Sequence, residues 1–90
     1  MFKPYLISYD LNSPGQKYDQ IFEVIKKYTY IKLQKSFWLV NTSSTPNQIA
    51  KEFDHIIDNN DRLFICELKD SYQGIASDEQ WTFIKEHIFK

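Results

Sequence analysis

Apolar positions recur in two rhythms along this chain, and each rhythm predicts a different kind of element. Residues 5–11 are apolar at nearly every position and rich in β-branched and aromatic side chains, which is typical of a buried strand. Residues 12–15 are all turn formers, so the strand ends there and Asp10 lies where the chain leaves the core. Ligand sites collect at such sheet edges, but an Asp at a turn also commonly accepts backbone hydrogen bonds or caps the next helix.

Two stretches with apolar residues every three or four positions predict amphipathic helices. In residues 18–28 the apolar stripe alternates with charged positions that are acidic early and lysine-rich late, which suits the helix dipole. In residues 45–57, Thr45 is a candidate N-cap and Gln48 completes a capping box. Residues 58–61 then end this helix, with Asn available for a left-handed cap.

Three more strands and a last helix follow from the same reasoning. Residues 30–34 and 37–40 are separated by two residues, which predicts an antiparallel pair with a tight connection or a bulge. Residues 62–68 are apolar on both faces, which favours a central strand. A second capping box at 77–80 predicts a C-terminal helix that extends to about residue 88.

The predicted order is strand, helix, strand, strand, helix, strand and a final helix. This order is typical of an α+β, ferredoxin-like βαββαβ sandwich with an extra C-terminal helix, in which two helices cover one face of an antiparallel sheet. We expect residues 1–90 to form a single domain, because a chain of 90 residues has no room for a second core. The open sheet face would be covered by a second subunit, by the C-terminal helix, or by both.

The composition predicts that the domain has a partner, and it excludes several kinds of site. Seven Phe, six Tyr and two Trp are a high aromatic load for so small a domain, which predicts an interface and favours a symmetric homodimer. The single cysteine, Cys66, excludes an intramolecular disulfide and a cysteine zinc set. The chain opens without a signal-peptide pattern and has no apolar run near 20 residues, so we expect a cytoplasmic protein with no membrane partner.

The net charge of −1 argues against a strong nonspecific nucleic-acid binder, but the lysines are unevenly placed. Five of them lie between positions 17 and 35, against two acidic residues, which predicts a local basic face. Two of the lysines end a predicted helix and two lie on a predicted edge strand, where charge also discourages aggregation. The candidate nucleic-acid-binding residues are Lys17, Lys26, Lys27, Lys32 and Lys35.

Three segments together resemble the CRISPR-associated Cas2 family and its VapD-type relatives. Residues 5–11 are similar to that family's first strand and its terminal Asp, residues 33–40 to its central strand pair, and residues 61–68 to its fourth strand. They occur in the family's order and cover most of residues 3–70. The resemblance implies a ferredoxin-like homodimer.

The resemblance also implies two functions. In one, the Asp that ends the first strand meets its symmetry mate and holds a divalent metal such as Mg²⁺, which activates water against an RNA or DNA phosphodiester. Asp10 is then the candidate metal ligand and catalytic residue, with Ser36 as a second catalytic candidate near it. In the other, the dimer has an architectural role and binds DNA without cleaving it.

The C-terminal helix stands where many family members have a strand that pairs with the partner, so a different dimer contact is expected. The segment after Asp10, where many members carry arginines, has one lysine, and the net charge is close to neutral. Both of these last two points argue against nuclease activity. We therefore expect a non-catalytic dimeric module that binds RNA, DNA or another protein, with a metal-dependent endoribonuclease or endonuclease as the alternative. A small-molecule sensor remains open as well.

Overall fold

Four antiparallel strands form one open sheet in the computed structural model, which describes residues 1–12, Gly15 and residues 17–89. The spatial order of the strands is β2-β3-β1-β4. The strands are β1 (Lys3–Asp10), β2 (Thr29–Gln34), β3 (Phe37–Thr42) and β4 (Arg62–Glu67).

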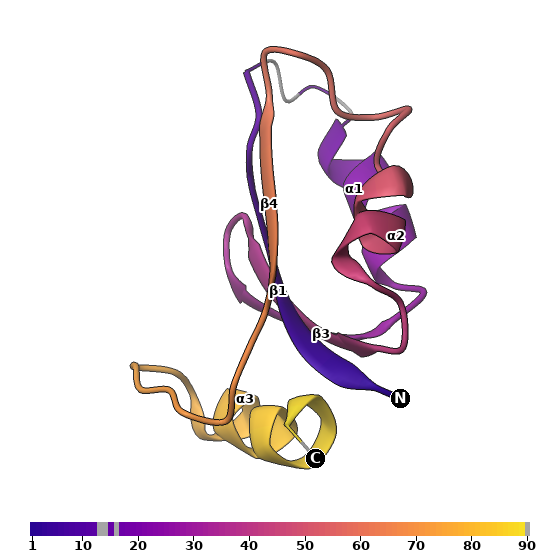
Figure 1. The fold of residues 1–90 in the computed structure, drawn as a ribbon. Coiled ribbons are helices and arrows are strands. Elements are labelled where there is room, and N and C mark those ends of the chain that lie inside the picture. Colours follow the sequence, from indigo (N-terminus) through magenta and orange to yellow (C-terminus); the bar gives the residue numbers. More distant parts are fainter. Residues whose placement is uncertain (13–14, 16, 90) are drawn as a thin grey trace.

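The helices are α1 (Lys17–Ile25), α2 (Pro46–Lys51), α3 (Asp78–Phe83) and a π-helical turn, η1 (Ile84–Ile88). Helices α1 and α2 lie on one side of the sheet, and the C-terminal helical segment lies apart from them (Figure 1). This arrangement confirms the predicted α+β, ferredoxin-like fold with a C-terminal helix.

The main core lies between the sheet and the first two helices. Alternate residues of β1 are buried on this side, and Ile7 stands opposite Trp38 in β3 and Ile65 in β4. Cross-strand partners share a face, so these three side chains point toward the helices. The fully or nearly fully buried residues of this core include Tyr5, Ile7, Tyr9, Ile21, Val24, Ile25, Trp38, Val40, Ile49, Phe53 and Ile56.

The C-terminal helical segment covers part of the opposite face of the sheet. Ile84 and Ile88 pack there against Leu39, and all three are buried. Asn41 is buried beside them, and its side-chain amide donates to the carbonyl of Ile88 at 2.9 Å. The expectation that this helix covers the open face is therefore met for the half of the sheet around Leu39.

No element among the described residues covers the other half of this face. Ser8 stands opposite Phe64 in β4, and the Phe64 side chain is 65% exposed. Asp10 lies two residues farther along β1, on the same face and opposite Arg62, and both side chains are exposed. We call these four residues, Ser8, Asp10, Arg62 and Phe64, the open half-face.

The prediction that residues 62–68 form a central strand is wrong, because β4 is an edge strand. Its apolar residues on the helix side, Leu63 and Ile65, pack against the main core. Phe64 points to the other side, where nothing in the described part of the chain covers it. Leu68, at the end of the predicted range, packs against the cluster of Leu39, Ile84 and Ile88, so the apolar residues away from the main core are only partly buried.

The ends of both sheet-covering helices differ from the predictions. Helix α2 ends at Lys51, and the chain continues in tighter turns such as the bond from the Phe53 amide to the Ala50 carbonyl at 3.0 Å. Phe53 nevertheless stays buried. Helix α1 ends at Ile25 rather than near residue 28.

No Asn takes the predicted left-handed cap, since the one positive φ within the described residues is that of Gly15, at 42°. The turn predicted at 12–15 includes residues 13 and 14, which lie outside the described residues.

Both predicted capping boxes are confirmed. The Thr45 hydroxyl accepts from the Gln48 amide at 3.2 Å, and Ser77 and Gln80 repeat the arrangement at the start of α3. The β2–β3 pair is antiparallel with a two-residue connection, as predicted, and its register shifts between Lys32 and Gln34. Across the described part of the chain, the helices are all too short or too polar to cross a membrane.

Candidate nucleic-acid interface

Asp10 and Ser36 lie at the same end of the sheet. Asp10 is the last residue of β1, where the strand leaves the core, and its side chain is exposed. The turn between β2 and β3 reaches this end, because the backbone N–H of Tyr9 donates to the carbonyl of Ser36 at 3.2 Å. The structure thus brings the two sequence candidates for catalysis to one edge of the sheet, on adjacent segments.

A single chain does not assemble a magnesium site around Asp10. Mg²⁺ takes near-octahedral oxygen coordination, usually from one or two carboxylates together with water or phosphate. Among residues 1–12, 15 and 17–89, no group of three or more His, Cys, Asp or Glu side chains is placed to hold a metal. The Asp10 carboxylate has suitable chemistry for Mg²⁺, but further ligands would have to come from a second chain or a bound phosphate.

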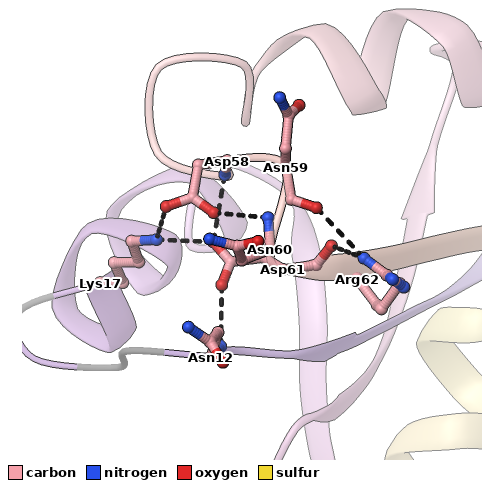
Figure 2. A network of polar contacts seen from close by, with 7 residues as sticks. All are labelled: Asn12, Lys17, Asp58, Asn59, Asn60, Asp61 and Arg62. Carbon is pink, nitrogen blue, oxygen red and sulfur yellow. Dashed lines mark hydrogen bonds and ion pairs between the residues drawn. The ribbon is translucent and has the colours of Figure 1, made fainter.

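The acidic residues that precede β4 form a partly buried polar network with Asn12 and Lys17. The Asp61 carboxylate is buried and accepts from the backbone N–H of Asn12 at 2.8 Å and from Lys17 Nζ at 2.6 Å. Asp58 accepts from the same ammonium at 2.9 Å, and its backbone N–H donates to Asp61 at 3.1 Å (Figure 2). This network joins the segment after β1 to the turn before β4.

These contacts also shift the pKa values of the network. Donation from Lys17 is the largest cause that lowers the pKa of Asp61 from 3.8 to about 2, and the amides of Asp58 and Asn12 add to it. Asp61 is likewise the largest cause that raises the pKa of the Lys17 ammonium above its usual 10.5. The charge of Lys17 is therefore shared with two carboxylates, which makes it a weaker partner for phosphate than an uncompensated lysine.

Sequence reasoning missed this network because it treated residues 58–61 as the end of a helix and Asp61 as the start of a strand, with no partner for either carboxylate. The available signal was an Asp at each end of a four-residue turn, just before a strand. The sequence did not show that Lys17, more than forty positions earlier, would meet both carboxylates.

The other four candidate lysines fall into two pairs. Lys26 pairs with the glutamate three positions earlier at 2.9 Å, and Lys27 approaches Glu52 at 3.4 Å. Lys32 and Lys35 have no carboxylate within 4 Å in the part of the chain that the structure describes. Of the five candidate lysines, the two without a carboxylate partner therefore both lie on the β2–β3 hairpin.

A cavity of about 370 Å³ lies beside these two lysines, between α1 and the β2–β3 hairpin. Tyr9 and Trp38 are buried and form its floor, whereas the side chains of Asp19, Lys32 and Lys35 are exposed and form its rim. We call it the aromatic hollow. Its lining residues are Tyr9, Tyr18, Asp19, Phe22, Lys32, Lys35 and Trp38.

The aromatic side chains of the hollow pack closely. The Phe22 and Trp38 rings stack with their centres 5.8 Å apart and their planes at 28°, and Tyr9 and Tyr18 lie 6.1 Å apart. The indole N–H of Trp38 donates to the Tyr9 hydroxyl at 2.9 Å, which fixes the floor. Burial raises the pKa of Tyr9, so this hydroxyl stays neutral at physiological pH. Lys32 Nζ lies 5.5 Å from the centre of the Trp38 ring.

The sequence did not predict the hollow. Phe22 was assigned to the buried stripe of its helix, but it is 37% exposed. Tyr18 and Phe22 are one turn apart on α1, a spacing that places two rings on the same side of a helix. That spacing was visible in the sequence. The sequence did not show that Trp38, Lys32 and Lys35 of the β2–β3 hairpin would lie next to these two rings.

One comparison with known proteins bears on this site. The family model described as CRISPR associated protein Cas2 matches residues 3–75 of the chain. The match begins with β1 and runs past the end of β4, but it stops before α3. It therefore includes Asp10, Ser36 and every residue of the aromatic hollow.

Proposed function

Because the chain belongs to the family of CRISPR associated protein Cas2, we propose that it forms a homodimer that binds nucleic acid without cleaving it. The observation that carries this proposal is the pair of uncompensated lysines, Lys32 and Lys35, on the rim of one aromatic cavity. Lysine ammonium groups bind phosphate, and aromatic rings stack on bases. The combination of lysines with aromatic rings therefore favours a nucleic acid over a protein partner.

The dimer is supported by the open half-face. Phe64 is a large apolar side chain, 65% exposed, on an edge strand that the chain itself does not cover. Natural proteins usually protect such edges with charge, proline or a covering element. A second copy packed on the open half-face would bury both copies of Phe64.

Binding is tested with fluorescently labelled single-stranded RNA, single-stranded DNA and duplex DNA at two salt concentrations. A dimer that uses both lysines of each chain neutralises about four phosphates, so the logarithm of the affinity for single strands should fall with a slope of roughly −3 against the logarithm of salt concentration. Binding that does not change with salt would contradict phosphate contacts. Binding to none of the three probes would reject the function and leave a protein partner as the alternative.

The first prediction concerns the two lysine pairs. We expect Lys32→Gln/Lys35→Gln to weaken binding to single strands about tenfold or more at low salt, because it removes about four cations per dimer. The matched control is Lys26→Gln/Lys27→Gln, which removes the same formal charge from lysines that already contact carboxylates. If the two double variants lose affinity equally, only net charge matters and the rim lysines have no special role.

A metal-dependent nuclease is the second candidate, and one observation favours it. Asp10 is exposed on the same face as Phe64, so a two-fold dimer through the open half-face would bring two copies of Asp10 toward its axis. Such a pair has the ligand chemistry for Mg²⁺, which would supply a Lewis acid and an activated water for phosphodiester hydrolysis. Ser36, at the same end of the sheet, is the second candidate for contact with a bound phosphate.

The second prediction separates the two candidates. Under the favoured function, wild-type protein incubated with labelled RNA and duplex DNA in Mg²⁺ or Mn²⁺ leaves both nucleic acids intact. The Asp10→Ala variant leaves them intact as well. Cleavage by the wild type that disappears in Asp10→Ala, but persists in the control Asp54→Ala, would establish the nuclease instead. Asp54 suits the control because it is exposed and lies after α2, on the helix side of the sheet.

A further inference from the structure

We propose that the aromatic hollow binds one unpaired base of a single-stranded nucleic acid, while Lys32 and Lys35 bind the adjacent phosphate. This inference rests on the proposed nucleic-acid binding and assigns a specific site to it. A general electrostatic contact would need only the lysines, whereas this site also needs the rings beneath them.

The size and the shape of the hollow suit a planar ring. Its volume, about 370 Å³, lies within the range of about 300–1,000 Å³ that is common for small-ligand sites. Helix α1 supplies Tyr18 and Phe22 on one side, and the sheet supplies Tyr9 and Trp38 at the floor. Aromatic side chains of this kind are the usual stacking platforms for bases in single strands.

The charges on the rim select an anion. Aromatic cavities also bind ammonium ligands, since a cation is attracted to the face of a ring. Here Lys32 already holds its own ammonium 5.5 Å from the centre of the Trp38 ring, and Lys35 adds a second positive charge. An external cation would be repelled by both lysines, whereas a base with a neighbouring phosphate satisfies the rings and the lysines together.

Asp19 gives the site an orientation. Its carboxylate is exposed on the rim, on the same helix as Tyr18 and Phe22. A carboxylate repels phosphate and accepts hydrogen bonds from the amino groups of bases. The base edge is therefore expected to face Asp19, and the phosphate to face the lysines of the hairpin.

A paired base does not fit this arrangement. In a duplex, each base is stacked on both faces and bonded along its edge, so it enters a protein cavity only after it is flipped out of the helix. The hollow should therefore discriminate single strands from duplexes of the same sequence. Ribose and deoxyribose strands both present this chemistry, and parallel titrations of the two show which one binds more tightly.

The test uses the full chain with the substitution Trp81→Phe, which leaves Trp38 as the only tryptophan. Three probes are titrated: a ten-nucleotide single strand, a backbone of the same length without bases, and the corresponding duplex. We expect the single strand to quench Trp38 fluorescence and the other two to leave it unchanged. Equal affinity for the single strand and the baseless backbone would overturn the proposal.

Two ring substitutions are then compared in the same background. Phe22→Leu removes a partly exposed ring and keeps an apolar side chain, and Tyr18→Leu is the second variant in case the first disturbs folding. Each should weaken binding to the single strand about tenfold and leave binding to the baseless backbone unchanged. The matched control is Tyr72→Leu, which removes an exposed ring in the segment before α3 and should leave both affinities unchanged.

The outcomes separate this inference from the proposed function. If the protein binds single strands but neither ring variant changes the affinity, the hollow is not the site and the general function stands. If the protein binds none of the probes, the proposed function fails, and this inference fails with it.

Discussion

At the scale of single residues, Asp61 shows how an acidic residue in a turn contributes to stability. Its carboxylate is buried, yet it accepts hydrogen bonds from two backbone amides and an ammonium. A buried carboxylate is costly unless it is paired and bonded in this way. The three donors explain why it stays ionised.

The third prediction follows from the lowered pKa of Asp61. Because the pKa in the folded state is about 2, against 3.8 normally, this carboxylate stabilises the fold above about pH 4 and loses its contribution as the pH falls toward 2. Thermal unfolding measured between pH 7 and pH 2 should show a smaller acid-dependent drop in Tm for Asp61→Asn than for the wild type. At pH 7 the variant should unfold roughly 5–10 °C lower, since it loses a charged acceptor that serves three donors.

Asp58→Asn is the control for this experiment, because the Asp58 side chain is 60% exposed and contributes one contact to Lys17. Its effect at pH 7 should be smaller. Parallel pH curves for wild type and Asp61→Asn would show that Asp61 does not govern acid sensitivity.

At the scale of elements, the capping boxes and the docking of the C-terminal segment have different origins. Thr45 and Ser77 begin their helices through side-chain contacts within four residues, which local sequence specifies. The docking of η1 depends on Asn41 and Leu39, from a strand more than forty positions earlier. Helix α3 is therefore defined locally but placed by the sheet.

The fourth prediction compares the two caps. Ser77→Ala and Thr45→Ala should each destabilise their helix by about 1 kcal/mol, because a backbone N–H in the first turn loses its acceptor. In Ser77→Ala the loss should appear as faster trypsin cleavage at Lys69 and Lys85, with little change in Tm. In Thr45→Ala it should lower the Tm, since α2 belongs to the main core. Equal cleavage rates in both variants would show that the C-terminal segment does not open independently.

At the scale of the whole molecule, the sheet has three kinds of surface. One face packs on α1 and α2, half of the other face packs on the C-terminal segment, and the open half-face remains. An exposed Phe on an uncovered edge strand marks an interaction surface rather than a neutral one. The proposed dimer uses this surface.

The fifth prediction tests whether the dimer forms through the open half-face. If the protein is a dimer through the open half-face, Phe64→Glu should convert it to a monomer at micromolar concentration in light scattering, because two buried negative charges would face each other. Ile75→Glu is the control, since Ile75 is fully exposed in the segment before α3. A wild type that is monomeric, or a Phe64→Glu variant that stays dimeric, would contradict the proposed interface.

The sequence by itself determined the order of elements, the α+β class and the starts of α2 and α3, because these depend on local periodicity and on contacts within a few residues. It also placed Asp10 at the end of its strand. Only the tertiary structure decided that β4 is an edge, that Lys17 is held by Asp58 and Asp61, and that Trp38 meets Phe22 beside two lysines. These features depend on which distant segments pack together, and a one-dimensional pattern of polar and apolar residues does not encode that pairing.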